Sequence, residues 1–216
     1  MRGAKNSPGG AKTTGQVTKE RRAGETRAQL IGSARRLFGQ RGYDAVSLSE
    51  IVAASGLTKG ALYHHFPDGK RALFEAVFVQ VEAESTAKAA AQVLAAGPAQ
   101  VDVVAAMKIA SSEFLSLSLD PELQRISLID APAVLGWERW REIAAEHGLG
   151  VIEASLSAAI EAGQIGPRPV KPLAHMLMAA LSESAMLVAG AEDQEAARIE
   201  VEGALFAVLD GLATTP

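Results

Sequence analysis

The stretch from Ser47 to Lys70 reads SLSEIVAASGLTKGALYHHFPDGK and contains two short helical patterns joined by a glycine. Ser47 is followed three residues later by Glu50, and this spacing predicts a capping box that begins a helix. Gly56 has no Cβ, so it suits the left-handed backbone of a sharp helix exit. Thr58 then fits the N-cap of a second helix. The pattern therefore predicts two helices separated by a tight turn.

The second of these helices is short and spans residues 59–65. It is expected to end before Pro67, because proline cannot continue a helix, and Asp68 is expected to cap the helix that follows. Two short helices around a glycine turn have the layout of a helix-turn-helix, which places its second helix in the major groove of DNA. We therefore expect a DNA-binding unit in this part of the chain.

One helix on each side is expected to complete this unit. Upstream, Thr26 and Gln29 fit a second capping box, and Gly42 is expected to end the helix after Arg41. Both flanking helices carry an apolar stripe at helical spacing. The upstream stripe consists of Leu30, Ile31, Ala34, Leu37 and Phe38, and the downstream stripe of Leu73, Phe74, Val77, Phe78 and Val81.

The segment from about Thr26 to Phe78 resembles the DNA-binding domain of the tetracycline-repressor (TetR) family of bacterial transcription regulators. The residues that carry the resemblance are Ala34, Leu37, Phe38, Gly42, Tyr43, Ile51, Ala54, Gly56, Leu57, Thr58, Gly60, Leu62, Tyr63, His65, Phe66, Lys70, Leu73 and Phe74. Many family members have two residues between the phenylalanine and the lysine, whereas three separate Phe66 from Lys70 here. We expect this departure to alter only the start of the next helix.

The resemblance, together with the basic composition of the first residues, which are rich in Gly, Ser and Thr, predicts the organisation of the chain. A basic disordered arm is expected over residues 1–23, the helix-turn-helix domain over 24–84, and a larger helical domain for ligand binding and dimerisation over 85–216. The fold class is therefore all-α, with about nine helices in total. In the C-terminal half, apolar spacing, Gly and Pro predict helices at about 98–119, 121–132, 137–147, 151–162, 173–189 and 194–212, with a break at Gly148 and Gly150.

Charge divides the chain into two unlike halves. Residues 1–80 carry 13 Lys and Arg against 6 Asp and Glu, whereas residues 81–216 carry 8 against 19, so the halves have net charges of +7 and −11. A basic front half suits a polyphosphate partner, and an acidic back half does not. Without the helix-turn-helix, a basic N-terminal segment would be explained equally well by solubility.

Composition narrows the class of protein further. The chain has 216 residues and no cysteine, which excludes a disulfide framework and thiolate chemistry. No run of about 18 apolar residues is present, and the N-terminus lacks the apolar stretch of a signal peptide, so we expect a cytoplasmic protein without a membrane partner.

The DNA contacts that the resemblance and the chemistry predict lie on the second helix and around it. They are Arg27, Ser47, Thr58, Lys59, Gly60, Ala61, Tyr63, His64 and Lys70. Lys59 can donate to guanine, and Ser47 and Thr26 are expected at helix N-termini that favour phosphate. Arg21 and Arg22 would extend the phosphate contacts. Ser47 and Thr58 are also fully explained as helix caps.

The C-terminal domain is expected to hold an unknown small-molecule effector, as the resemblance implies. Large apolar groups with a few polar ones suit such a pocket, although Met and Phe at helical spacing are more often core residues. The candidates are Met107, Phe114, Asp130, Trp137, Trp140, His147, Met176 and Glu183. The last two helices are apolar on several sides, so we expect them to pair with a second copy in a homodimer. The alternative is that they complete a monomeric core.

The expected function is that of a sequence-specific transcription regulator, most simply a repressor that a small molecule releases from an inverted-repeat DNA operator. The alternatives are a ligand-independent or architectural DNA-binding protein, and an enzyme. No nucleophile elbow, phosphate-binding glycine loop or metal-spaced His/Cys set appears in the sequence. We therefore expect no enzymatic activity, no cofactor and no metal.

Overall fold

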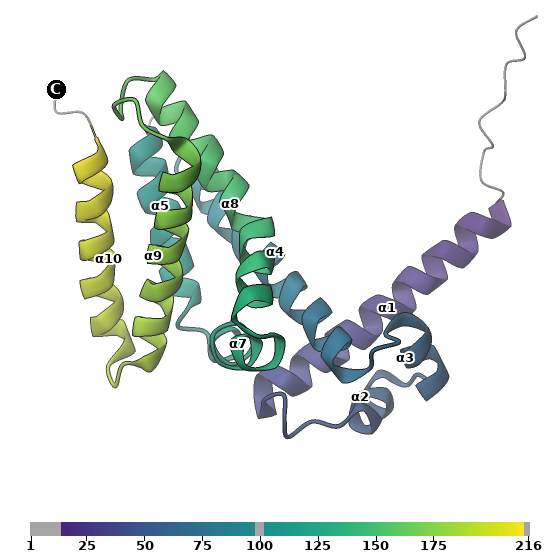
Figure 1. Cartoon of the computed structure of the whole chain (residues 1–216). Coiled ribbons are helices and arrows are strands. Elements are labelled where there is room, and N and C mark those ends of the chain that lie inside the picture. Colours follow the sequence, from purple (N-terminus) through teal and green to yellow (C-terminus); the bar gives the residue numbers. More distant parts are fainter. Residues whose placement is uncertain (1–13, 98–101, 214–216) are drawn as a thin grey trace, which may run out of the picture.

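The computed structural model describes residues 14–97 and 102–213, and these residues are mostly helical (Figure 1). The elements are α1 (Thr14–Arg41), α2 (Leu48–Ser55), α3 (Lys59–His65), α4 (Lys70–Ala95), α5 (Val103–Leu117), α6 (Pro121–Leu123), the π-helix η1 (Gln124–Asp130), α7 (Ala131–Leu135), α8 (Trp137–Glu161), α9 (Val170–Gly190) and α10 (Gln194–Leu212). Because α6, η1 and α7 follow one another without a gap, they form one rod. The expected all-α fold of about nine helices is confirmed.

The predicted helix caps around the turn are present. The Ser47 hydroxyl accepts from the Glu50 backbone N–H at 3.2 Å, and the Ser47 N–H donates to the Glu50 carboxylate at 2.8 Å. Gly56 ends α2 in the left-handed region, with φ of 66°. The Thr58 hydroxyl accepts from the Ala61 N–H at 3.2 Å and begins α3. Short-range sequence signals therefore fix the geometry of the helix-turn-helix.

The first helix begins much earlier than the sequence predicted. Residues Thr14–Ala23 are already helical, so the expected disordered arm is wrong for this stretch, and residues 1–13 lie outside the described part. Thr26 therefore lies inside α1 and cannot cap it. Its hydroxyl donates instead to the Arg22 carbonyl at 2.9 Å, the usual way in which a threonine within a helix is satisfied.

The start and length of α4 also differ from expectation. Gly69, with φ of 71°, occupies the N-cap position, and no side chain caps the helix, so Asp68 does not have the predicted role. This is the local change that the extra residue between Phe66 and Lys70 produces. From Lys70 the helix continues to Ala95 and crosses the expected domain boundary at residues 84 and 85 without a break.

In the C-terminal domain, the expected break at Gly148 and Gly150 is wrong, because α8 is continuous through both residues. A Cβ on Gly148 would lie 2.7 Å from the Met178 terminal carbon, so this glycine serves a close approach of α8 to α9. The helix expected from residue 98 starts at Val103 with Asp102 as its cap, and residues 98–101 are outside the described part. Pro172 lies in the first turn of α9, where a proline is tolerated.

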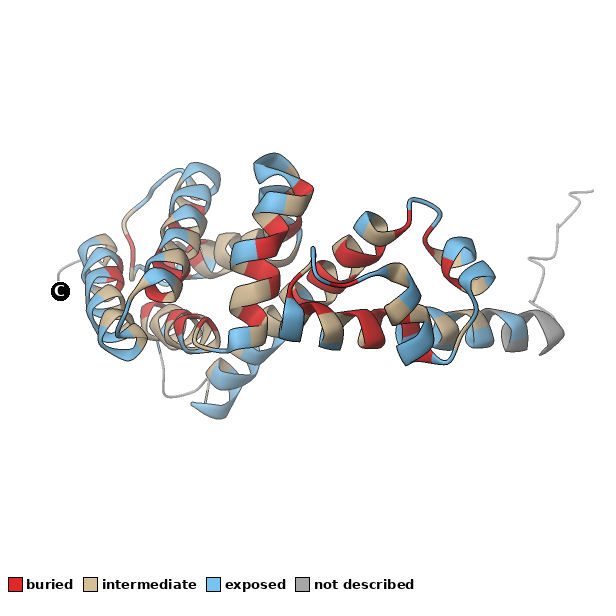
Figure 2. Ribbon diagram, turned by 90° about the horizontal axis from the view of Figure 1, so that it is seen from below, coloured by how far each residue is buried: buried red, intermediate tan, exposed pale blue. Residues whose placement is uncertain are grey.

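Two hydrophobic clusters hold these elements together (Figure 2). The larger one contains Phe38, Tyr43 and Phe74, whose rings contact one another at centroid distances of 5.1 to 5.6 Å. It extends from α1 to α4 into η1, α7 and the start of α8, so the DNA-binding unit and the C-terminal domain share one core. The second cluster lies among α5, α8, α9 and α10.

By length and composition alone, α8 and α9 would each be long and apolar enough to cross a membrane. This is weak evidence for a membrane protein, because core helices of soluble domains have the same properties. In this structure both helices pack in the helical bundle and contact each other.

Candidate DNA interface and ligand cavity

The second helix of the turn, α3, presents its polar face to solvent. Lys59, Gly60 and His64 are exposed, and 51% of the Tyr63 surface is accessible. The opposite side of the helix is anchored by Leu62, which is buried. A rigid helix with an open outer face can enter a major groove without rearranging. The part of α3 predicted to contact bases therefore has the required accessibility, and its role in binding stays a prediction.

Ser47 lies at the N-terminus of α2, where it caps the helix and stays a candidate phosphate contact. The hydrogen bond from the Ser47 backbone N–H lowers the pKa of Glu50 to about 2. Arg41 adds to this effect, because its guanidinium lies 2.7 Å from the Glu50 carboxylate. The ionised Glu50 weakens the attraction of this helix end for a second anion. Phosphate binding at Ser47 would therefore depend on its exposed hydroxyl and on Arg41.

Several basic side chains surround α3. Lys70 lies over the Tyr43 ring at 4.0 Å, and Arg27 lies over the Phe66 ring at 5.3 Å. Both cations are thus held on aromatic faces beside the helix-turn-helix. Arg21 and Arg22 are exposed on the early part of α1, which Figure 1 shows as a long rod extending beyond α3. These positions suit phosphate contacts from an ordered helix, not from a flexible arm.

The DNA-binding unit is joined to the C-terminal domain through the π-helix η1. Its last residue, Asp130, is buried and accepts from the Tyr43 backbone N–H at 2.7 Å, while the Arg125 guanidinium lies 3.5 Å from the same carboxylate. A second link runs from Arg35 of α1 to Glu122 of α6, at 2.6 Å. Asp130 was predicted to line a ligand pocket; the structure places it at the junction between the domains.

Replacing Asp130 by alanine is expected to lower the free energy of unfolding by about 2 kcal/mol, because hydrogen bonds to charged groups contribute about 1.5–3 kcal/mol. Asp130→Asn keeps an acceptor and should lose less. Urea denaturation measures both changes. Asp44→Ala, at an exposed position on the same loop as Tyr43, is the matched control. Equal stability of Asp130→Ala and Asp44→Ala would show that the Tyr43 contact does not hold the domains together.

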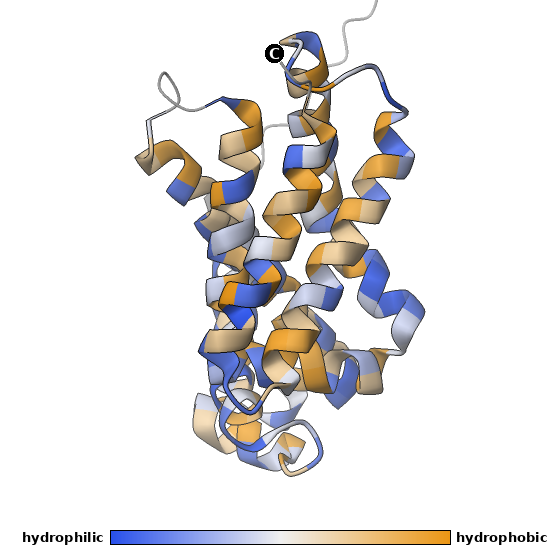
Figure 3. Cartoon of the chain, turned by 90° about the vertical axis from the view of Figure 1, so that its left-hand side faces the viewer, coloured by the Kyte–Doolittle hydropathy of each residue, from blue (hydrophilic) through white to orange (hydrophobic). Residues whose placement is uncertain are grey.

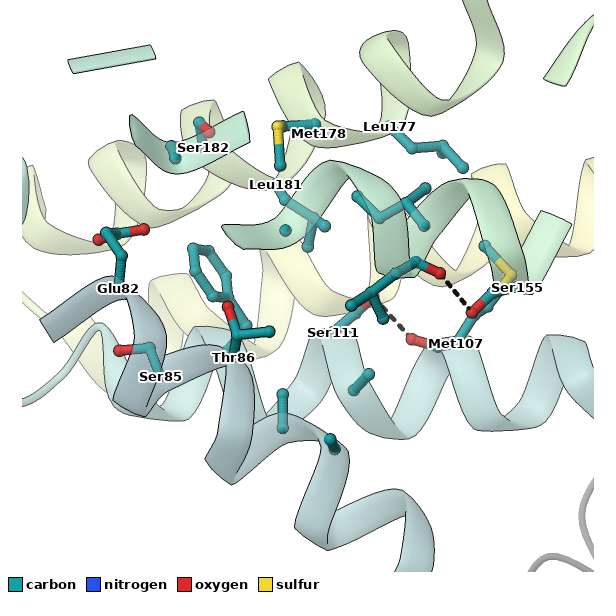
Figure 4. Close-up of a pocket in the computed structure, with 18 of the residues that line it drawn as sticks. Glu82, Ser85, Thr86, Met107, Ser111, Ser155, Leu177, Met178, Leu181 and Ser182 are labelled. Atoms are coloured by element: carbon teal, nitrogen blue, oxygen red, sulfur yellow. Dashed lines mark hydrogen bonds between the residues drawn. The ribbon is translucent and has the colours of Figure 1, made fainter. Parts of the chain in front are cut away.

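A cavity of about 430 Å³ lies between α4, α5, α8, α9 and α10 (Figure 4). Three of the predicted pocket residues line it, namely Met107, Phe114 and Trp140. The indole N–H of Trp140 donates to the Ser127 carbonyl at 2.9 Å, which fixes the ring in this wall. The volume falls in the range of pockets that enclose drug-sized molecules.

The other predicted pocket residues do not border this cavity. Trp137 and Met176 are exposed, at 54% and 68%, and Glu183 is exposed as well. His147 is partly buried and is not part of the lining. Residue type alone could not show which side of each helix faces inward.

Sequence reasoning missed the polar part of the lining, above all Glu82. Glu82 lies on α4, before the boundary expected from the sequence at residues 84 and 85. It was therefore counted as part of the DNA-binding domain and not as a pocket residue. Glu82, Ser85 and Thr86 are spaced three and four residues apart, which places three polar side chains on one face of the helix. This spacing could have indicated a polar lining.

The outer face of α9 and α10 is open and carries apolar side chains among polar and charged ones (Figure 3). The large exposed apolar side chains are Met176 and Leu187 on one side of α9, and Ile199 and Val208 on α10, with accessible fractions of 68, 56, 58 and 52%. Ile199 and Val208 lie nine residues apart and so flank α10 on opposite sides. On α10, Gly203, Ala207 and Gly211 recur at intervals of four residues, which places small side chains along one stripe. Such a surface allows the close approach of other helices.

The described residues contain no group of three or more His, Cys, Asp and Glu side chains that would hold a metal ion. The described residues do show an exposed helix-turn-helix with basic side chains around it, and a cavity among the helices of the C-terminal domain. They define a class of protein, the helix-turn-helix transcription regulators.

Comparison with known families places the chain within that class. Residues 30–77 match the family of bacterial regulatory proteins called the tetR family, and residues 104–212 match the tetracyclin repressor-like C-terminal domain. A TetR-family transcriptional regulator from Pectobacterium atrosepticum, known from a crystal structure, is 33% identical, with coverage of 91% of this chain and 98% of that one and a TM-score of 0.78. The chain belongs to the TetR family of transcription regulators.

Two further similarities are narrower. A transcriptional repressor of Mycobacterium tuberculosis is 32% identical over 120 residues, which are 55% of this chain and 60% of that protein. RolR, crystallised with resorcinol, is 18% identical, with coverage of 91% of this chain and 97% of that one and a TM-score of 0.65. At this identity the similarity to RolR shows a common fold alone. The relatives are DNA-binding regulators, a kind of protein that is not enzymatic.

Proposed function

We propose that this chain acts in the cytoplasm as a homodimeric repressor that binds an inverted-repeat operator and leaves it when a small molecule enters the cavity. The observation that carries the proposal is that α4 and η1 each serve both domains. Ser127 of η1 borders the cavity, and Asp130 at the end of η1 holds the Tyr43 N–H. A displacement of η1 at the cavity wall would therefore move the segment that contacts Tyr43 in the DNA-binding unit.

The exposed apolar side chains on α9 and α10 support the dimeric part of the proposal. One α3 helix supplies few base contacts, whereas two copies related by two-fold symmetry double them and fix the spacing of the half-sites. Met176, Leu187 and Ile199 are exposed on these two helices, and exposed apolar side chains gathered on one surface mark interaction sites. A second copy packed along α9 and the Ile199 side of α10 would cover these three positions.

Release by a ligand requires that the ligand bind the two conformations with different affinity. The cavity wall is formed by helices that also set the position of α4, and α4 begins beside α3 at Lys70. A ligand that alters the packing of α4 would change the separation of the two α3 helices in the dimer. The common fold with RolR, which binds resorcinol, supports a ligand in this domain.

A substitution that places a larger side chain in the cavity tests the proposal. Ala110 lines the cavity, so Ala110→Phe should occupy part of it, whereas Ala87→Phe, on the exposed side of α4, is the matched control. An operator selected from random DNA is bound by each protein, and a library of small aromatic and aliphatic compounds is screened for loss of fluorescence anisotropy. We expect compounds that release the wild type and Ala87→Phe but leave Ala110→Phe on the DNA. Release that is insensitive to Ala110→Phe, or operator binding that no compound alters, would contradict the ligand-controlled part of the proposal.

A further inference from the structure

Among the described residues, the lining of the cavity contains a single ionisable side chain, that of Glu82 on α4. The other polar side chains of this lining are hydroxyls and the indole of Trp140, and it includes no Lys, Arg or His from residues 14–97 and 102–213. The ligand of this cavity would therefore meet one acid and no base. This imbalance bears directly on the charge that a ligand can carry.

Glu82 belongs to a polar region at one side of the cavity. Glu82, Ser85 and Thr86 lie three and four residues apart and so share one face of α4, as Figure 4 shows. Ser127 of η1 adjoins the Glu82 carboxyl, and within the described protein its own buried hydroxyl has no hydrogen-bond partner other than that carboxyl. Much of the remaining wall is apolar and includes Met107, Phe114, Leu177, Leu181, Leu205 and Leu209. The cavity thus has a polar side and a larger apolar part.

Glu82 differs from the other acidic residues of α4 in lacking a cation. Glu75 pairs with Arg139, and Glu84 pairs with Arg35. Within the described residues no basic side chain forms an ion pair with Glu82. Burial raises the pKa of Glu82 to about 7, and the nearby Ser127 hydroxyl offsets this effect in part. No charged side chain of α1, α5, α7, α8 or η1 acts on that pKa in the described structure, so the carboxyl is isolated electrostatically.

Buried carboxylates in proteins are normally paired with a cation or hydrogen-bonded on both oxygens. A molecule that brings a positive charge to Glu82 would supply the missing partner, and its apolar body would fill the rest of the wall. A carboxylate or phosphate at the same place would meet a like charge with no compensating base. The Glu82 carboxylate therefore favours a cationic ligand and disfavours an anionic one.

We propose that the cavity takes an apolar ligand with one protonated amine, and that Glu82 is the counter-charge that selects it. This inference rests on the proposed function, because it specifies the effector of the same cavity. A volume of about 430 Å³ suits a compact aromatic or polycyclic amine, not a long chain with several charges.

Three fluorescent probes with one apolar body test the inference on the purified full-length protein without DNA. They are pyrenylmethylamine, pyrenylmethanol and pyrenecarboxylate, which are cationic, neutral and anionic at about pH 8. Competition between the probes and the effect of Ala110→Phe show whether they occupy the cavity. We expect the amine to bind about tenfold or more tightly than the alcohol, because a charge-assisted hydrogen bond replaces a neutral one, and we expect the carboxylate to bind more weakly than both.

The variant Glu82→Gln removes the charge and keeps the shape of the side chain. It should reduce binding of the amine by about tenfold or more and leave binding of the alcohol unchanged. The fold should be retained, since a neutral amide avoids the cost of burying a carboxylate. Glu153→Gln, on α8 but not in the lining, is the matched control and should bind all three probes like the wild type. Lowering the pH through about 7 should weaken amine binding to the wild type and to Glu153→Gln but not to Glu82→Gln, because Glu82 becomes protonated.

The possible outcomes distinguish failure of the proposed ligand class from failure of the proposed ligand cavity. If the alcohol enters the cavity and the amine shows no advantage, or if Glu82→Gln binds the amine as tightly as the wild type, the inference on ligand class is wrong and the proposed ligand cavity stands. If none of the three probes binds in a manner that Ala110→Phe abolishes, both the ligand cavity and the ligand class are contradicted.

Discussion

The double substitution Lys59→Ala with Tyr63→Ala is expected to weaken operator binding by about a thousandfold or more while the protein remains a folded dimer. Each good base contact contributes about 1–3 kcal/mol, and a symmetric dimer loses both contacts twice. The two side chains are exposed on α3, so their truncation should change the free energy of unfolding by less than about 0.5 kcal/mol. Fluorescence anisotropy with the selected operator measures the loss.

The matched control for this variant is Lys88→Ala, which removes an exposed lysine on α4 away from α3. It should leave operator affinity nearly unchanged. The salt dependence gives a second readout, because loss of a phosphate contact lowers the slope of log affinity against log salt by about one. Operator binding that survived both substitutions would show that α3 does not read the DNA.

The second large effect is expected at the dimer face. Leu187→Arg with Ile199→Arg places two charges on each chain in an apolar surface, and the partner chain would double that number. Burying a charge without a partner costs several kcal/mol, so the variant should be monomeric at micromolar concentration and should lose operator binding. Analytical ultracentrifugation reports the mass, and anisotropy reports the DNA affinity.

Ile129→Arg is the control for the dimer variant, since Ile129 is also exposed, at 52%, but lies on η1. It should remain dimeric. If the Leu187 and Ile199 variant sedimented as a dimer and still bound the operator, α9 and α10 would not form the interface. The monomeric variant should also unfold more easily than the wild type, because association stabilises the folded chain by mass action.

The helix-turn-helix was predictable because its signals are local. The signals are the capping residues Ser47, Glu50 and Thr58 and the left-handed Gly56. Each depends on backbone groups no more than four residues away, and all four residues have the expected geometry. The same local reasoning failed at Thr26, where an equally good capping pattern lies inside a longer helix. A cap signal shows that a helix can begin at a residue, and the helix-forming sequence before it decides whether it does.

The candidate ligand cavity was less predictable because it depends on contacts between distant segments. Met107, Phe114 and Trp140 were identified by type, and type alone could not separate them from Trp137 and Met176, which are exposed. Gly148 was taken as a helix break because a sequence does not reveal that Met178 packs against it.

The junction between the domains also escaped prediction. A π-helix such as η1 departs from the 3.6-residue period on which helix prediction depends. The contact of Asp130 with Tyr43 joins residues 87 positions apart, so no local pattern reports it.

Selection of bound sites from a random DNA pool by the full-length protein tests most directly that the chain works as a symmetric dimer reading DNA through α3. The structure predicts enrichment of an inverted repeat, with half-sites spaced by about one helical turn or a multiple of it, and an even number of chains in the complex. A pool without an enriched sequence, or a single asymmetric site occupied by one chain, would contradict this arrangement.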